Sequence, residues 1–354
     1  MWSDVEPRLY RYQIQPWALV QATMLALVAR MPGIEQMAGR CASLLKTTNA
    51  SSLSHAFRRA TFAAFVKRMV GLLECQHTPG RGELVALDGM AVTLPKTQRH
   101  HCKKYNHTTV GGGVVWTYMI HAARGICPVK VLRVVQGAWH DSVILRQVPL
   151  IARGPIYLAD PGFYCLDLLQ QWLTQGVHFV VRCKQSNFQR EILETVGNAR
   201  WHGRVYILED VIAHLGTPKR KTRPRVRLVI ALLPSGERIL LASDQFRWTA
   251  EVLLDAYKQR WHIERFHRFL KDTLGLAHLY SFHQIGIEFL IHTALLMALL
   301  LFFSDKNPSG DTIVLLRQAL RAVRHALGLD TPWKRNTYSP RRSKKSSTRK
   351  GKNL

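Results

Sequence analysis

The order of apolar segments between residues 83 and 182 places the strongest limit on how this chain can fold. Five segments are short, apolar and bounded by turn residues, which is typical of strands. Two segments with helical periodicity flank the fourth of them. This order favours an α/β fold with a mixed sheet and flanking helices. The predicted strands are 83–88, 109–120, 128–135, 155–160 and 177–182, and the predicted helices are 141–151 and 164–175.

Two of the predicted strands end in an isolated aspartate. Asp88 follows an apolar segment and precedes a glycine, and Asp160 precedes the turn pair Pro161–Gly162. An aspartate in this position can simply cap the following turn or helix. The alternative is that both carboxylates serve one site, and a third acid elsewhere in the chain would favour it.

A polar stripe lies along a predicted helix at residues 257–271. With an advance of about 100° per residue, four polar side chains fall within an arc of about 60°, and four apolar side chains face the opposite side, as on a helix packed against a core. The stripe can also be a solvated face with pairs at i,i+4. The polar members are Tyr257, Arg260, Glu264 and Lys271, and the apolar members are Ile263, Phe266, Phe269 and Leu270.

Two strand-end aspartates and one helix-borne glutamate suit a site for two divalent metal ions. Carboxylate oxygens are preferred ligands of Mg²⁺ and Mn²⁺. Two such ions can stabilise the attacking and the leaving oxygen at a phosphorus centre. We therefore expect Asp88, Asp160 and Glu264 to bind two Mg²⁺ (or Mn²⁺) ions.

The stripe residues also resemble the signature of a known family. Tyr257, Arg260, Glu264 and Lys271 have the spacing Tyr-x2-Arg-x3-Glu-x6-Lys. This spacing is similar to that of DDE transposases of bacterial insertion sequences, in the group named after insertion sequence four. The resemblance covers roughly residues 80 to 300.

The resemblance implies an enzyme that cuts DNA at the ends of an insertion sequence and transfers these ends into target DNA. Asp88 and Asp160 would be the first two catalytic acids, and Glu264 the third. All three would be metal ligands. The implied fold is an RNase H-like core, with the first aspartate on the first strand and the second on or after the fourth.

The resemblance also implies how the protein meets its substrate. Tyr257, Arg260 and Lys271 would bind DNA by contacting phosphates beside the metal ions. The implied partners are double-stranded DNA, both element ends and target, and a second copy of the chain in a homodimer on paired ends.

The pattern along the chain divides it into five parts. The N-terminal part is helical and is a candidate for DNA-end recognition, with a plain helical cap or a dimerisation unit as the alternative. A β-rich insertion interrupts the core before the helix that carries Glu264, with predicted strands at 203–209, 225–233 and 237–243 and a predicted hairpin turn at 234–236. The predicted parts are a helical domain (1–80), the core (81–183 and 248–304), the insertion (184–247), a C-terminal helical region (305–332) and a basic tail (333–354).

Charge indicates a polyanionic partner. The chain contains 50 Lys and Arg against 23 Asp and Glu, a formal net charge of +27. Basic residues concentrate at 219–227 and at 333–354, where a solvated flexible segment is the alternative to a DNA contact. A surplus of this size makes nucleic acid the first candidate.

Composition also predicts the compartment. The six cysteines form neither a close pair nor a zinc pattern, which favours a reducing cytoplasm. The apolar run 289–303 is 15 residues long, whereas a membrane span needs about 20. We expect a buried core helix there, no membrane association, and a bacterial cytoplasmic protein that associates with DNA.

Two other function classes are compatible with parts of this pattern. An RNase H-like nuclease would cut DNA without joining strands. A DNA-binding regulator derived from a transposase would need none of the three acids.

Overall fold

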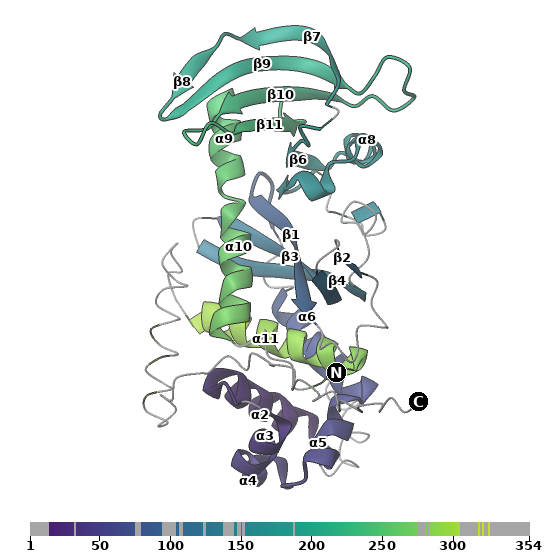
Figure 1. Ribbon diagram of the computed structural model, residues 1–354, viewed down its shortest axis with the longest axis vertical. Helices are drawn as coiled ribbons and strands as arrows, with labels where there is room; N and C mark the ends of the chain where they lie inside the picture. The colour runs from purple at the N-terminus through teal and green to yellow at the C-terminus, as the bar shows by residue number, and fades with distance from the viewer. Residues whose placement is uncertain are drawn as a thin grey trace, which may run out of the picture.

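A mixed β-sheet runs through the centre of an elongated molecule, with β-strands at one end and helices at the other (Figure 1). The structure of the protein is a computed structural model. The structure describes residues 14–31, 33–74, 79–93, 104–105, 109–122, 125–136, 145–146, 150, 153–186, 188–274, 276, 281 and 283–304, and the single positions 318, 321 and 325.

The core of the sheet contains the five predicted strands. Strand β1 (Leu84–Thr93) pairs antiparallel with β3 (Thr109–Ala122) on one side and parallel with β5 (Ile156–Ala159) on the other. Strand β4 (Gly125–Gln136) pairs with β3, and β6 (His178–Arg182) runs parallel to β5. The prediction of a mixed sheet with flanking helices is therefore confirmed, with the core order β4-β3-β1-β5-β6.

The β-rich insertion does not form a separate sheet. Strand β11 (Arg238–Ser243) pairs antiparallel with β6, so the insertion extends the core sheet at its β6 edge. Strands β10 (Arg225–Leu232) and β11 match the predicted strands at 225–233 and 237–243. Strand β9 (Val205–Leu215) overlaps the strand predicted at 203–209 and continues six residues beyond it. The predicted hairpin turn between β10 and β11 is also present, with Gly236 at φ +81°.

Two strands of the insertion were not predicted. Strand β7 (Arg190–Gly197) pairs with β9 at the outer edge of the sheet, and β8 (Arg200–His202) also pairs with β9. The side chains of β7 from residue 191 to 196 are all exposed. A strand that buries neither face does not require the alternation of apolar and polar residues by which a strand is predicted.

The helices of residues 16–74 share one apolar core with helices near the C-terminal end of the described chain. This core also includes Ala86 and Met90 of β1. The segment is helical as predicted, and its separation as a domain stays a prediction. The helices concerned are α2 (Pro16–Ala29), α3 (Ile34–Arg40), α4 (Ala42–Leu45), α5 (Ala50–Phe57), α6 (Ala60–Glu74), α10 (Trp261–Arg268) and α11 (Gln284–Ser304).

Helix α11 confirms a helix at 289–303 and its burial as far as Leu299, whereas Leu300 is exposed. Every residue from Phe289 to Leu299 is buried, including His292. In the part of the chain that the structure describes, no single helix is long and apolar enough to cross a membrane. One bent pair, α2 with α3, meets the length and composition test, and its buried residues belong to the core described above.

Two further predictions concern segments at the margins of the described chain. The predicted helix at 164–175 is present as α8 (Leu166–Gln175). The predicted helix at 141–151 lies mostly outside the described residues, as do the C-terminal region 305–332 and the tail 333–354.

Candidate active site

The parallel pairing of β1 with β5 brings the two aspartates to the same level of the sheet. Leu87 is in register with Ala159, and each aspartate is the next residue along its strand direction. Strand β5 ends there, but β1 continues to Thr93 because β3 still pairs with it, with Asp88 opposite Thr117. Asp88 therefore marks the end of the parallel pairing, whereas the sequence predicted the end of the strand.

Each aspartate also accepts a local backbone hydrogen bond. Asp160 caps the short 3-10 helix Pro161–Phe163 and accepts the N–H of Gly162 at 2.8 Å, as the capping alternative predicts. Asp88 accepts the N–H of Gly89 at 2.8 Å. Such bonds use one oxygen of each carboxylate and leave the other oxygen available for a further partner.

The prediction of one continuous helix over 257–271 is wrong. Tyr257 lies in the last turn of α9 (Ala250–Lys258), a turn follows at 259–260, and α10 carries Glu264. Lys271 lies in the π-helix η4 (Phe269–Thr273) that continues α10.

Backbone hydrogen bonds explain both interruptions. At the turn, the N–H of Arg260 bonds to the carbonyl of Tyr257 at 3.0 Å, and the N–H of Ile263 to the carbonyl of Arg260 at 3.1 Å. These i−3 bonds tighten the helix. Beyond α10, the N–H of Leu274 reaches the carbonyl of Phe269 at 3.0 Å, which is an i−5 bond and widens it.

The apolar side of the segment behaves as predicted despite these interruptions. The four side chains expected to face a core are fully buried. They pack in the same core as the N-terminal helices. They are Ile263, Phe266, Phe269 and Leu270.

Arg260 connects two of the three acids. Its Nη2 donates to Glu264 in an i,i+4 ion pair, and its Nη1 lies 4.0 Å from Oδ2 of Asp88. The guanidinium also lies near the Tyr257 ring, with Cζ 5.8 Å from the ring centroid. Its side chain is only 13% exposed, so these contacts occur largely out of solvent. The stripe is thus not a solvated face at this position.

The three carboxylates influence one another electrostatically. Burial raises the pKa of Asp88 to about 7, and the negative charges of Asp160 and Glu264 contribute to this rise. Arg260 and the Gly89 N–H partly offset it. An acid with two acidic neighbours and a raised pKa is stabilised in its ionised form by a bound cation.

Two further residues of the same helical segment face Asp88. Nδ1 of His267 is 3.6 Å from Oδ2 of Asp88, and His267 is buried. Burial lowers the pKa of Lys271, whereas the charge of Asp88 raises it. In sequence, His267 follows Arg260 by seven and Glu264 by three, the spacing of one helix face, and this signal identifies it.

Tyr257 is largely buried, with 8% of its surface exposed. Burial raises the pKa of its hydroxyl to about 12, although the charges of Arg260 and Arg182 lower it. The hydroxyl therefore stays protonated near neutral pH and can donate a hydrogen bond. Arg182, at the end of β6, was not identified from the sequence, because only the sheet brings β6 beside α9.

The donor chemistry of this site suits a divalent metal ion. Three carboxylates provide oxygen ligands, and burial, together with repulsion from Asp160 and Glu264, raises the pKa of Asp88. Among the residues that the structure describes, no three His, Cys, Asp or Glu side chains lie close enough together to hold one ion. Asp88 and Glu264 instead share Arg260.

The basic residues at 219–227 separate into two groups. Lys219, Arg220 and Lys221 are exposed on the loop between β9 and β10. Arg225 is exposed as well, but Arg227 is buried and pairs with Asp210. These residues form one charge cluster along the sequence. Only their burial in the structure distinguishes the exposed basic residues from the buried one.

Comparison with known proteins places this geometry in a family context. Residues 79–301 match the family described as "Transposase DDE domain". The chain is 26% identical over 147 residues to a "Probable transposase for insertion sequence element IS5377" of Geobacillus stearothermophilus, a match that covers 41% of this chain and 37% of that protein. A solved piggyBac transposase synaptic complex with hairpin DNA is similar to it with a TM-score of 0.41 and 12% identity, over 90% of this chain and 73% of that one.

Proposed function

The chain belongs to the transposase DDE domain family, and from that premise we propose that it cuts DNA at the ends of an insertion sequence and joins them to target DNA. The observation that carries this proposal is the juxtaposition of Asp88 and Asp160 on parallel strands, with Glu264 linked to Asp88 through Arg260. The reaction is phosphoryl transfer, first to water and then to the 3′-OH of the cut end.

Transposases of this family generally use divalent metal ions. We assign Asp88, Asp160 and Glu264 as the residues that would hold two Mg²⁺ or Mn²⁺ ions. When bound, such ions lower the pKa of a water nucleophile and stabilise charge on the phosphate oxygens. The raised pKa of Asp88 supports this assignment, because bound cations would offset the repulsion among the three acids.

The basic side chains of the site would hold the DNA backbone. Arg260 already neutralises two of the acids, and an incoming phosphate offers it a further anionic partner. Lys271 carries its ammonium near Asp88, and the Tyr257 hydroxyl can donate to a phosphate oxygen. Such contacts set register and orientation and not base sequence. Positioning and charge neutralisation then provide the catalysis, with no covalent enzyme intermediate.

The proposal also has finer features, which concern the core fold, the family group, the DNA contacts and the location. The core order β4-β3-β1-β5-β6, with β3 antiparallel to its neighbours, supports an RNase H-like core. The spacing of Tyr257, Arg260, Glu264 and Lys271 supports membership of the insertion-sequence-four group. DNA-end recognition by the N-terminal helices and a homodimer on paired ends belong to the same proposal, as does a bacterial cytoplasmic location.

The test is an in vitro reaction with labelled DNA that carries the element's own ends and a plasmid target. We expect cleavage and joining with Mg²⁺, neither with EDTA, and neither for Glu264→Gln. Glu194→Gln is a matched control, because Glu194 is an exposed carboxylate on β7. Cleavage without joining would identify a nuclease, and end binding without metal-dependent cleavage would identify a regulator; either result would overturn the proposal.

A further inference from the structure

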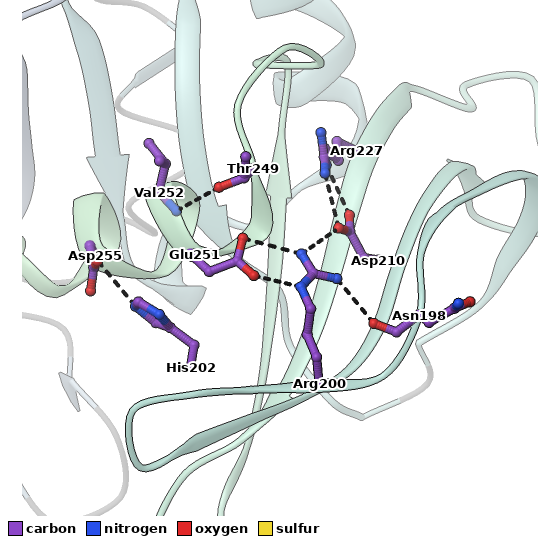
Figure 2. Close-up of polar contacts among 9 residues, drawn as sticks. All are labelled: Asn198, Arg200, His202, Asp210, Arg227, Thr249, Glu251, Val252 and Asp255. Carbon is purple, nitrogen blue, oxygen red and sulfur yellow. Dashed lines mark hydrogen bonds and ion pairs between the residues drawn. The ribbon is translucent and has the colours of Figure 1, made fainter.

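A chain of ion pairs connects the insertion to the helix that leads into the candidate active site. Arg200 of β8 binds Glu251 of α9 through two bonds, Nε to Oε1 at 2.5 Å and Nη2 to Oε2 at 3.1 Å (Figure 2). A paired guanidinium and carboxylate in this geometry restrains both position and angle. The contact therefore limits how α9 can rotate or slide against the insertion.

The arginine is itself held in place by the strands behind it. Nη2 of Arg200 lies 3.3 Å from Oδ2 of Asp210, and Nη1 donates to the carbonyl of Asn198 at 3.0 Å. Asp210 is buried and receives two bonds of 2.9 Å from Arg227 of β10. Figure 2 shows Arg200 between Glu251 on one side and Asp210 on the other. All three nitrogens of the Arg200 guanidinium are thus engaged.

A second contact lies one helical turn further along α9. Nε2 of His202 is 3.1 Å from Oδ2 of Asp255. Residues two apart on a strand and four apart on a helix are separated by about 6 Å in both cases. The spacing between Arg200 and His202 on the strand therefore equals the spacing between Glu251 and Asp255 along the helix axis. Trp201, between the two strand residues, points to the other face and is 69% exposed.

At Gly197, the backbone lies close to the guanidinium of Arg200. A Cβ atom on Gly197 would lie 2.6 Å from Nη1 of Arg200 and 3.1 Å from Oδ2 of Asp210. The first distance is well below normal contact. Only glycine leaves the guanidinium in its present place.

Helix α9 ends at Lys258, one residue after the candidate site residue Tyr257 and two residues before Arg260. Its buried residues Ala250, Leu253 and Tyr257 pack on the sheet, so the helix is supported on that side by apolar contacts. Apolar packing alone is not directional. The ion pairs add the directional restraint on the side facing β8.

We propose that Arg200 and Glu251 are positioning residues, which hold α9 where Tyr257 and Arg260 reach the three acids. This inference rests on the proposed function. Neither residue touches the acids or would touch the scissile phosphate, and each acts through the helix. In this proposal the insertion fixes the position of α9 and of the site residues Tyr257 and Arg260 at its C-terminal end.

The test compares Arg200→Lys and Glu251→Gln with the control Glu209→Gln. Lysine keeps the charge of Arg200 but not its fork geometry. Glu209 neighbours Asp210 on β9 and pairs with Arg190 of β7, away from α9. We would measure the single-turnover rate of end cleavage at saturating DNA, the Kd for end DNA, and hydrogen exchange in peptides from α9 and from β9–β10.

We expect a cleavage rate lower by about tenfold or more in both test variants, because small misplacement of reacting groups costs up to about 10²-fold. Kd should stay within about twofold, and exchange should rise in α9 but not in β9–β10. The double variant should be no slower than the slower single variant, since both changes break one interaction. Gly197→Ala should reproduce the effect without removing any charge.

Cleavage within twofold of the wild type in both variants would overturn the inference. So would an equal loss in Glu209→Gln, or faster exchange in β9–β10 as well as α9, because either indicates general destabilisation. If the wild type cuts no end DNA with Mg²⁺, the proposed function fails. Hydrogen exchange in α9 then still decides whether Arg200 and Glu251 hold this helix.

Discussion

The buried imidazole of His267 faces the carboxylate of Asp88, with 3.6 Å between Nδ1 and Oδ2. Burial lowers the pKa of His267 to about 3, helped by the nearby charges of Lys271 and Arg260. The ring is therefore neutral near pH 7 and can offer Asp88 a hydrogen-bond donor without adding a charge. His267 is thus an uncharged polar neighbour of this carboxylate.

Replacing His267 with Phe should preserve the apolar packing of the site and remove the donor. We expect the rate of metal-dependent cleavage to fall by about tenfold, with the Kd for end DNA unchanged, because Asp88 loses a partner that orients it. His283→Phe serves as the control, since His283 is exposed. A rate within twofold of the wild type would show that Asp88 does not depend on this ring.

Asp88 should make the metal-free protein less stable as the pH rises. Its pKa is about 7 in the folded state and near its ordinary value of 3.8 in the unfolded chain, so the folded state holds this proton more tightly. Stability from this group is present below about pH 4 and is lost between pH 4 and pH 7. At about 1.36 kcal/mol per pKa unit, the loss is at most about 4 kcal/mol.

Thermal unfolding in EDTA at pH 5 and pH 8 measures this effect. Asp88→Asn should unfold at a higher temperature than the wild type at pH 8, and Mg²⁺ should raise the midpoint of the wild type more than that of the variant. Equal pH dependence in the two proteins would contradict the assigned pKa.

Arg260 should be replaceable by neither Lys nor Gln. A lysine ammonium cannot contact Asp88 and Glu264 with the separate nitrogens that the guanidinium provides. We expect Arg260→Lys to lower the cleavage rate by about 10²-fold, and Arg260→Gln also to raise the pKa of Asp88 further, since Arg260 now lowers it. Arg268→Lys, at an exposed position on α10, should cleave as the wild type does.

The buried pair of Asp210 and Arg227 should be critical for folding stability. Both side chains are almost fully buried. Removal of Arg227 leaves the buried Asp210 carboxylate with Arg200, 3.3 Å away, as a partner, so the cost is up to about 3–5 kcal/mol. Arg227→Met should therefore lower the free energy of unfolding in urea by this amount. Arg204→Met, at an exposed arginine between β8 and β9, should change it by less than about 0.5 kcal/mol.

The exposed basic loop should contribute to DNA affinity without selecting a sequence. Lys219→Gln with Lys221→Gln should weaken binding to all duplexes alike and reduce the salt slope of log Kd by about 2. Lys184→Gln, an exposed lysine outside the loop, is the control. An unchanged slope would exclude phosphate contacts by this loop.

The sequence by itself determined the features that depend on neighbours along the chain. Short apolar segments bounded by turn residues located β1, β5 and β6, and helical periodicity identified the buried side of residues 263–270. Glu264 and its basic neighbours were identified by their spacing along one helical segment, and the two aspartates by their positions after apolar segments. A side chain's face on one strand or helix follows from the period of that element alone.

Only the tertiary structure decided how these elements meet. Parallel pairing of β1 with β5 aligns Asp88 with Asp160 across 72 residues of chain, and no local pattern encodes that register. The pKa of Asp88 likewise depends on charges and burial supplied by three separate segments. The helix interruption at 259–260, the burial of Arg227 and the attachment of α9 to β8 also belong here. The strand register, the burial of Arg227 and the attachment of α9 depend on packing and desolvation by residues distant in sequence, which no local pattern records.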